Sequence, residues 1–180
     1  MNLWHDFDEK KIQPSEFHVI TEIERDTKVK YEIDKDTGLL KLDRVLSTSL
    51  RFPGNYGFMP KTLSEDGDPL DVFIIMHETV KPMTMVKCAP IGYIEMIDND
   101  EADEKILAVP LYKGSYFAQF TDINEIPQNF INEVVHFLRV YKDLEKDNRV
   151  EIRGVHNRAA AEKIIIDAKA RYNRAFPKKR

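Results

Sequence analysis

Residues 65–71 place four carboxylates within seven positions, directly before the apolar run of residues 72–76. Five consecutive apolar side chains, several of them β-branched or aromatic, predict a buried strand, because a half-exposed strand would alternate apolar with polar residues. Carboxylates gathered at the mouth of such a strand repel one another unless positive charge lies among them. The chain must therefore build a sheet around one strongly acidic strand end.

The acidic turn itself is stiff. Gly67 can adopt a positive φ, and Pro69 fixes its own φ and favours extended geometry at Asp68. Asp66, Asp68 and Asp71 are thus held in a defined turn. One interpretation is an all-oxygen site for Mg²⁺ or Mn²⁺. The other is a solvated acidic turn, in which Asp, Gly and Pro are common for local reasons. The turn alone leaves both interpretations open.

The length of 180 residues favours one domain over residues 1–180, with the basic residues 177–180 expected to be a disordered tail. Hydrophobic residues make up 42% and charged residues 32%, and no stretch has the length of a membrane span. Residues 1–10 lack the pattern of a secretory signal, and the single cysteine, Cys88, fits a reducing compartment, so we expect a cytoplasmic protein. A net charge of -4 provides no broad positive field for nucleic acid.

Alternation and turn residues predict mainly short strands in the first two thirds of the chain. A hairpin turn is expected at residues 36–38, and Pro90 with Gly92 predicts a bend or bulge. The aromatic residues 52–58 contain Pro, Gly and Asn and predict a packed loop. The expected strands cover residues 17–24, 29–33, 40–44, 72–76, 85–97 and 106–109.

Helical spacing appears only in the last third of the sequence. Apolar residues after Pro127 predict a helix over residues 130–142, and Asn157 is expected to cap a last helix that runs to about Ala170. A strand over residues 149–155 lies between them. Strands first and helices last predict an α+β fold, with an antiparallel barrel or curled sheet and helices packed outside it.

The polar residues form an unusual set. Carboxylates that gather divalent cations, together with Lys and Arg that hold anionic oxygens, are what phosphoryl transfer to water requires. The set comprises Glu22, Glu32, Asp66, Asp68, Asp71, Asp98 and Asp103, the cations Lys30, Arg44, Lys105 and Lys142, and the phenols Tyr56 and Tyr141.

Residues 66–72 match the D-G-D-P-x-D-[VIL] signature of the soluble family I inorganic pyrophosphatases. Residues 30–35, 43–44, 55–58 and 141–145 also resemble segments of that family, in the same order. The resemblance extends from Phe17 to the last helix.

This resemblance implies a small five-stranded antiparallel β-barrel of OB type with flanking helices, including a C-terminal one. It implies hydrolysis of diphosphate to two orthophosphates with several Mg²⁺ ions, for which Mn²⁺ or Zn²⁺ could substitute. It also implies a bacterial-type homohexamer with no nucleic-acid or membrane partner. The sequence itself gives only weak support for an oligomer. Phe137, beside His136, lies outside the main apolar stripe of the predicted helix.

The resemblance also implies roles for individual residues. Asp66, Asp71 and Asp103 resemble the ligands of the tightest metal site, with Asp71 bridging to a second metal. Asp98, Glu22 and Glu32 resemble the residues that serve the metals arriving with substrate. Asp68 resembles the base that takes the proton from the attacking water. The phosphate-binding set comprises Lys30, Arg44, Tyr56, Lys105, Tyr141 and Lys142.

Two segments depart from the family pattern. The segment after Glu22 lacks a common proline and is slightly shorter, and Asp100 and Glu101 add acids that could replace an assigned ligand. Two other classes also remain as alternatives. One is a nucleotide or phosphomonoester hydrolase that uses the same metals. The other is an OB-type nucleic-acid-binding module, against which the acidic faces argue.

Overall fold

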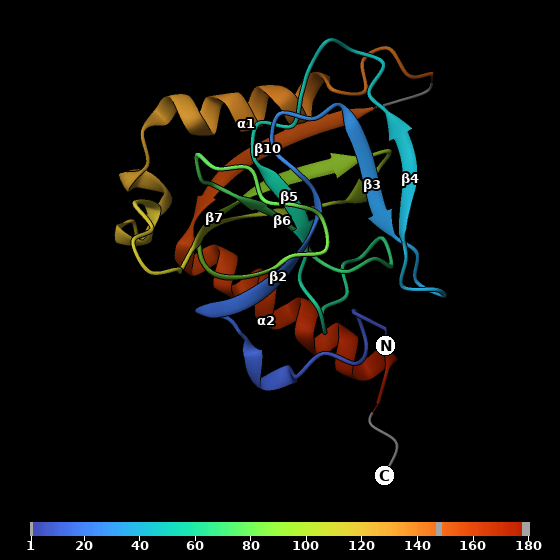
Figure 1. Cartoon of the computed structure of the whole chain (residues 1–180), viewed down its shortest axis with the longest axis vertical. Helices are drawn as coiled ribbons and strands as arrows, with labels where there is room; N and C mark the ends of the chain where they lie inside the picture. Colours follow the sequence, from blue (N-terminus) through green and yellow to red (C-terminus); the bar gives the residue numbers. More distant parts are fainter. Residues whose placement is uncertain (1, 147–148, 178–180) are drawn as a thin grey trace.

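The computed structural model describes residues 2–146 and 149–177, so residues 178–180 of the expected tail lie outside the described part. Its centre is a ring of five strands (Figure 1). The ring closes because β2 pairs with β7 as well as with β5. This closed ring confirms the expected five-stranded barrel. In order around the ring, the strands are β2 (Glu16–Ile23), β5 (Asn55–Phe58), β6 (Asp71–Ile74), β9 (Lys105–Pro110) and β7 (Met85–Asp98).

One strand pair of the ring differs from the expected antiparallel pattern. β6 and β9 are parallel, in a register that places Asp71 opposite Lys105. The other neighbouring pairs of the ring are antiparallel. The parallel pair brings the acidic start of β6 beside the start of β9, although the two lie 34 residues apart in the sequence.

The prediction of a loop at residues 52–58 is wrong for its second half, because Asn55–Phe58 forms the buried strand β5. Gly57 explains how the strand fits. A Cβ added at Gly57 would lie 2.0 Å from the carbonyl oxygen of Ile20 on the neighbouring strand β2. The glycine that indicated a loop is therefore required by the close approach of two backbones.

A separate hairpin stands at the rim of the barrel (Figure 1). It consists of β3 (Val29–Ile33) and β4 (Leu40–Val45), joined by the turn that the sequence predicted. The register shifts between Lys30 and Tyr31, whose partners are Arg44 and Leu42. The bulge leaves Asp43 without a partner opposite it, and it changes which side chains of β4 face the barrel.

Both predicted helices form, the first two residues earlier than predicted at each end and the second about five residues longer. α1 (Gln128–Val140) follows Pro127, and α2 (Arg158–Ala175) begins at Asn157, whose side chain accepts a hydrogen bond from the backbone N–H of Ala160 at 3.1 Å. Phe137, however, does not support an oligomer, in contrast to the sequence prediction. Phe137 is 2% exposed and packs against Phe52, with ring centroids 4.8 Å apart. No helix in the described ranges is long and apolar enough to span a membrane.

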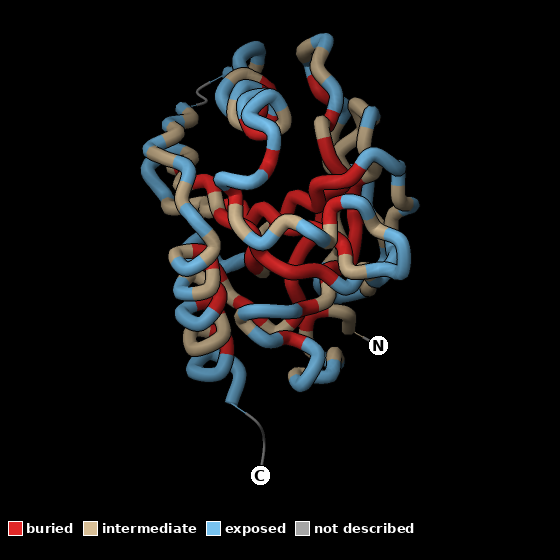
Figure 2. The backbone as a smooth tube through the Cα atoms, turned by 90° about the vertical axis from the view of Figure 1, so that its left-hand side faces the viewer, coloured by how far each residue is buried: buried red, intermediate tan, exposed pale blue. Residues whose placement is uncertain are grey.

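One further strand and several short elements complete the fold. β10 (Val150–Asn157) pairs with β7 and extends the sheet, which confirms the strand predicted at residues 149–155. Buried segments concentrate in the centre of the molecule (Figure 2). The remaining elements are η1 (Glu9–Lys11), β1 (Ile12–Gln13), β8 (Glu101–Ala102), η2 (Phe117–Gln119), η3 (Ile123–Glu125) and β10 (Val150–Asn157).

Candidate active site

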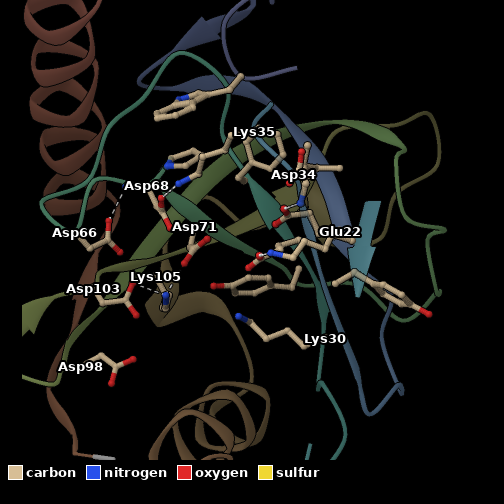
Figure 3. A pocket seen from close by; sticks show the side chains of 18 of the residues that line it. Glu22, Lys30, Asp34, Lys35, Asp66, Asp68, Asp71, Asp98, Asp103 and Lys105 are labelled. Carbon is tan, nitrogen blue, oxygen red and sulfur yellow. Dashed lines mark hydrogen bonds and ion pairs between the residues drawn. The ribbon is translucent and has the colours of Figure 1, made fainter. Parts of the chain in front are cut away.

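A cavity of about 580 Å³ lies between the barrel and the β3–β4 hairpin (Figure 3). Its wall includes every candidate site residue from the sequence except Arg44. Acidic and basic side chains from segments far apart in the chain therefore meet in one place. The candidates on the wall are Glu22, Lys30, Glu32, Tyr56, Asp66, Asp68, Asp71, Asp98, Asp103, Lys105, Tyr141 and Lys142.

The acidic turn is held by hydrogen bonds between its backbone and nearby side chains. Gly67 has a φ of +88°, and the backbone N–H of Asp68 donates to Oδ1 of Asp66 at 2.9 Å. The buried hydroxyl of Thr62 accepts from the N–H of Leu70 at 2.9 Å and donates to the carbonyl of Met59 at 2.6 Å. These bonds fix both arms of the turn, so its carboxylates face the cavity in a defined arrangement.

Lys105 lies between two of the candidate ligands. Its Nζ is 2.5 Å from a carboxylate oxygen of Asp71 and 2.5 Å from one of Asp103. Burial alone would lower the pKa of Lys105, but the charge of Asp71, reinforced by Tyr56 and Asp103, holds it well above its usual range. Burial raises the pKa of Asp103 and Asp66, and the charge of Asp71 adds to both effects. This side of the cavity is thus a partly buried acidic cluster whose carboxylates are stabilised by nearby positive charge.

The second acidic segment is a tight hairpin. Asn99 and Asp100 both have positive φ, 49° and 69°. This backbone pattern is typical of a two-residue hairpin turn whose twist matches that of the flanking strands. The turn joins β7 to β8 and leaves Asp98 and Asp103 on the cavity wall. Asp100 is 84% exposed at its side chain, and Glu101 is also exposed. Neither added acid therefore lines the cavity in place of an assigned ligand.

Glu22 closes the opposite side, at the end of β2 (Figure 3). Its Oε1 accepts a hydrogen bond from the N–H of Ile33 at 2.7 Å. Burial raises the pKa of Glu22 to about 8, with a further contribution from the charge of Asp71. Glu22 is therefore largely protonated at neutral pH until a cation binds near it.

Two tyrosines form an apolar wall with polar tips. Burial raises the pKa of Tyr56 and of Tyr141, so both phenols stay neutral and can donate hydrogen bonds. The ammonium of Lys105 lies 5.9 Å from the ring centre of Tyr56, and that of Lys142 lies 5.4 Å from the ring centre of Tyr141. Lys142 also pairs with Asp98.

Arg44, the remaining candidate, is not among the residues that line the cavity. Its Nε lies 2.8 Å from Asp43, and its Nη1 lies 2.6 Å from Glu145, beyond the end of α1. Asp43 lies at the bulge in β4, where its carboxylate contacts both Arg44 and Lys30. Its distance from the Lys30 ammonium is 3.0 Å. Arg44 thus stands beside the cavity and connects the hairpin to the segment that follows α1.

The sequence analysis missed Lys35 and Lys41 as cavity residues. Lys35 pairs with Asp68, and Lys41 lies 3.1 Å from Glu32. Both lysines occur in an exposed hairpin, where cations are common, so no local pattern distinguishes them. The contact between Lys35 and Asp68 joins positions 33 residues apart and depends on the folded hairpin.

The cavity has the donor chemistry of a site for hard cations. All of its acidic ligand candidates offer oxygen, the donor that Mg²⁺ prefers. The Oδ1 atom of Asp98 is buried without a hydrogen-bond partner. Within the described ranges, no three acidic, His or Cys side chains stand close enough together to hold a metal ion as they are. The ammonium of Lys105 occupies the space between Asp71 and Asp103 instead.

Comparison with known proteins agrees with this geometry. The family described as Inorganic pyrophosphatase matches residues 19–173. An inorganic pyrophosphatase of Xylella fastidiosa is 43% identical over 91% of this chain and 93% of its own length. The solved inorganic pyrophosphatase of Thermus thermophilus superposes with a TM-score of 0.91 at 34% identity, covering 96% of this chain and 99% of its own. That of Helicobacter pylori superposes with a TM-score of 0.87 at 33% identity, covering 90% and 96%. The chain belongs to the inorganic pyrophosphatase family.

Proposed function

We propose that this chain hydrolyses diphosphate to two orthophosphates and that it requires Mg²⁺, with Mn²⁺ or Zn²⁺ as substitutes. The observation that carries the proposal is the convergence of oxygen ligands and lysines on one cavity. Diphosphate and the acidic turn would repel each other without a bound cation. When bound, divalent cations would neutralise the substrate and lower the pKa of a bound water towards neutrality.

The protein residues would then act as follows. Asp68 accepts the proton of the attacking water, whose oxygen forms a bond to one phosphorus as the bridging P–O bond breaks. Lys30, Lys105, Lys142 and Arg44 balance the charge on the transferring and leaving phosphates, and Tyr56 and Tyr141 donate hydrogen bonds to their oxygens. Asp66, Asp71 and Asp103 would hold the cations, with Asp98, Glu22 and Glu32 as further ligands.

The proposal extends to the assembly and location of the protein. We take residues 1–180 as one catalytic domain that works as a cytoplasmic homohexamer, without nucleic-acid or membrane partners. With Phe137 in the core, the hexamer depends on family membership alone. Light scattering at micromolar concentration should give six times the chain mass, and a monomer would contradict this part of the proposal.

Phosphate release from diphosphate, with and without Mg²⁺, tests the proposed activity. Turnover should require Mg²⁺, stop in a chelator and resume when Mg²⁺ is added in excess. Ca²⁺ should bind but support little turnover, because its larger and more flexible coordination shell orders the water poorly. A nucleotide or a phosphomonoester should be a poor substrate and a weak competitor. Full activity in chelator would contradict the proposal, and preference for a nucleotide would identify a different hydrolase.

A further inference from the structure

The turn of the β3–β4 hairpin places Lys35 on the cavity wall, opposite the acidic turn. Figure 3 shows its side chain directed towards Asp68, with which its ammonium forms an ion pair. None of the roles described above uses this lysine. Since Asp68 is the proposed proton acceptor, Lys35 stands next to the position where bonds would change.

The N-terminal segment holds Lys35 in this place. The side-chain amide of Asn2 donates to the backbone carbonyl of Lys35 at 2.8 Å, and the Lys35 ammonium lies 5.5 Å from the ring centre of Trp4. Trp4 is itself buried, and its Nε1 donates to the carbonyl of Thr62 at 2.7 Å, just before the acidic turn. Its ring also meets Phe176 beyond α2, at 5.4 Å between centroids. Trp4 therefore contacts both the β3–β4 hairpin, at Lys35, and the segment before the acidic turn, at Thr62.

The charge around Lys35 differs from that around the inner lysines. Lys105 is buried between two carboxylates, and Lys142 is largely buried beside Asp98. The Lys35–Asp68 pair lies in solvent, with side chains 48% and 56% exposed. An exposed ion pair contributes little to stability, so the ammonium of Lys35 can exchange a carboxylate for a more highly charged anion at little cost.

We propose that Lys35 is a further substrate-binding residue, whose ammonium moves from Asp68 to a phosphate oxygen when diphosphate binds. The movement leaves the carboxylate of Asp68 free to meet the attacking water. The backbone stays anchored through Asn2, so a change of the Lys35 rotamer suffices. This inference rests on the proposed function, because it assumes that diphosphate is the anion.

The test measures binding of imidodiphosphate, a diphosphate analogue that resists hydrolysis, by calorimetry in Mg²⁺. Lys35→Met should weaken binding about 10-fold or more, the scale of a lost hydrogen bond to a charged group, and Lys35→Arg should recover most of it. Lys81→Met is the matched control, because Lys81 is 82% exposed and pairs with Glu24 away from the cavity. An affinity of Lys35→Met within twofold of wild type would overturn the inference.

The Asp68→Asn background separates direct binding from an effect through Asp68. If Lys35 binds the analogue itself, Lys35→Met should weaken binding in this background as well. If Lys35 acts through Asp68 alone, Lys35→Met should no longer weaken binding of the analogue in this background, and the inference would be wrong.

The fluorescence of Trp4, the single tryptophan, gives an independent signal. The analogue should change its emission in wild type, and an equal change in Lys35→Met would contradict a moving ammonium. A wild-type protein that neither binds the analogue nor hydrolyses diphosphate would instead refute the proposed function.

Discussion

Asp71 and Lys105 face each other across the parallel strands β6 and β9, and the lysine ammonium lies 2.5 Å from the Asp71 carboxylate. The same ammonium is 2.5 Å from Asp103. One protein cation thus balances two largely buried acids that are also proposed to hold metal. Metal binding and the stability of the folded chain should therefore be linked through this lysine.

Lys105→Met should destabilise the metal-free protein by about 3–5 kcal/mol, because it leaves two largely buried carboxylates without their cation. Mg²⁺ should recover part of this loss and should stabilise the variant more than it stabilises wild type. Denaturant unfolding with Mg²⁺ and with chelator measures both effects. Lys87→Met is the control, since its exposed pair with Glu16 should contribute at most about 1 kcal/mol. Wild-type stability of Lys105→Met in chelator would show that the pair is not needed.

Glu22→Gln should remove most of a pH dependence of stability in the metal-free protein. Burial raises the pKa of Glu22 from 4.5 to about 8 in the folded state. Because the folded pKa is the higher one, the folded state is favoured most below pH 4.5, and this contribution is lost as pH rises through about 8. At about 1.4 kcal/mol per pH unit, the free energy of unfolding falls by at most about 5 kcal/mol between these two pH values.

Denaturant unfolding in chelator at about pH 5 and about pH 9 measures this difference. Wild type should lose more stability between the two than Glu22→Gln does. Glu24→Gln is the matched control, because Glu24 follows two residues later and pairs on the surface with Lys81. Equal pH dependence of wild type and Glu22→Gln would mean that Glu22 is ionised in the folded protein at neutral pH.

Arg44→Lys should lower kcat/KM by an amount that corresponds to about 1–3 kcal/mol of transition-state stabilisation. The guanidinium of Arg44 binds Asp43 and Glu145 with two different nitrogens, whereas Lys offers a single point charge. Steady-state kinetics on diphosphate measures the loss. Arg51→Lys is the control, because its guanidinium donates to a backbone carbonyl in an exposed position. Unchanged kcat and KM in Arg44→Lys would place Arg44 outside the functional site.

The sequence predicted those elements whose signals are local. The apolar run after the acidic turn predicted β6, Asn157 predicted the start of α2, and Pro90 with Gly92 predicted the shift of register in β7. In each case the deciding residues lie next to each other in the chain. A local sequence pattern therefore suffices to indicate the structure.

Features that depend on distant residues could not be predicted. Gly57 is typical of a loop by its local sequence, and only the close approach of Ile20 explains its place in a strand. Phe137 lies outside the apolar stripe of its helix, and only its contact with Phe52 explains its burial. The bulge that turns Arg44 towards Glu145 depends on pairing between β3 and β4. Family resemblance supplied the candidate site, since spacing gives no sign that Lys30 and Asp68 line one cavity.

The proposed catalysis depends on different roles for two neighbouring carboxylates: Asp68 is the proposed base, and Asp71 is a proposed metal ligand. The measurement that tests it most directly is phosphate release from diphosphate across a Mg²⁺ titration in Asp68→Asn and Asp71→Asn. Asp68→Asn should be slower by about 10²–10⁴-fold at every Mg²⁺ concentration, as for a lost general base. Asp71→Asn should regain part of its rate as Mg²⁺ rises. Rescue of Asp68→Asn by Mg²⁺, or near wild-type turnover in that variant, would contradict the account.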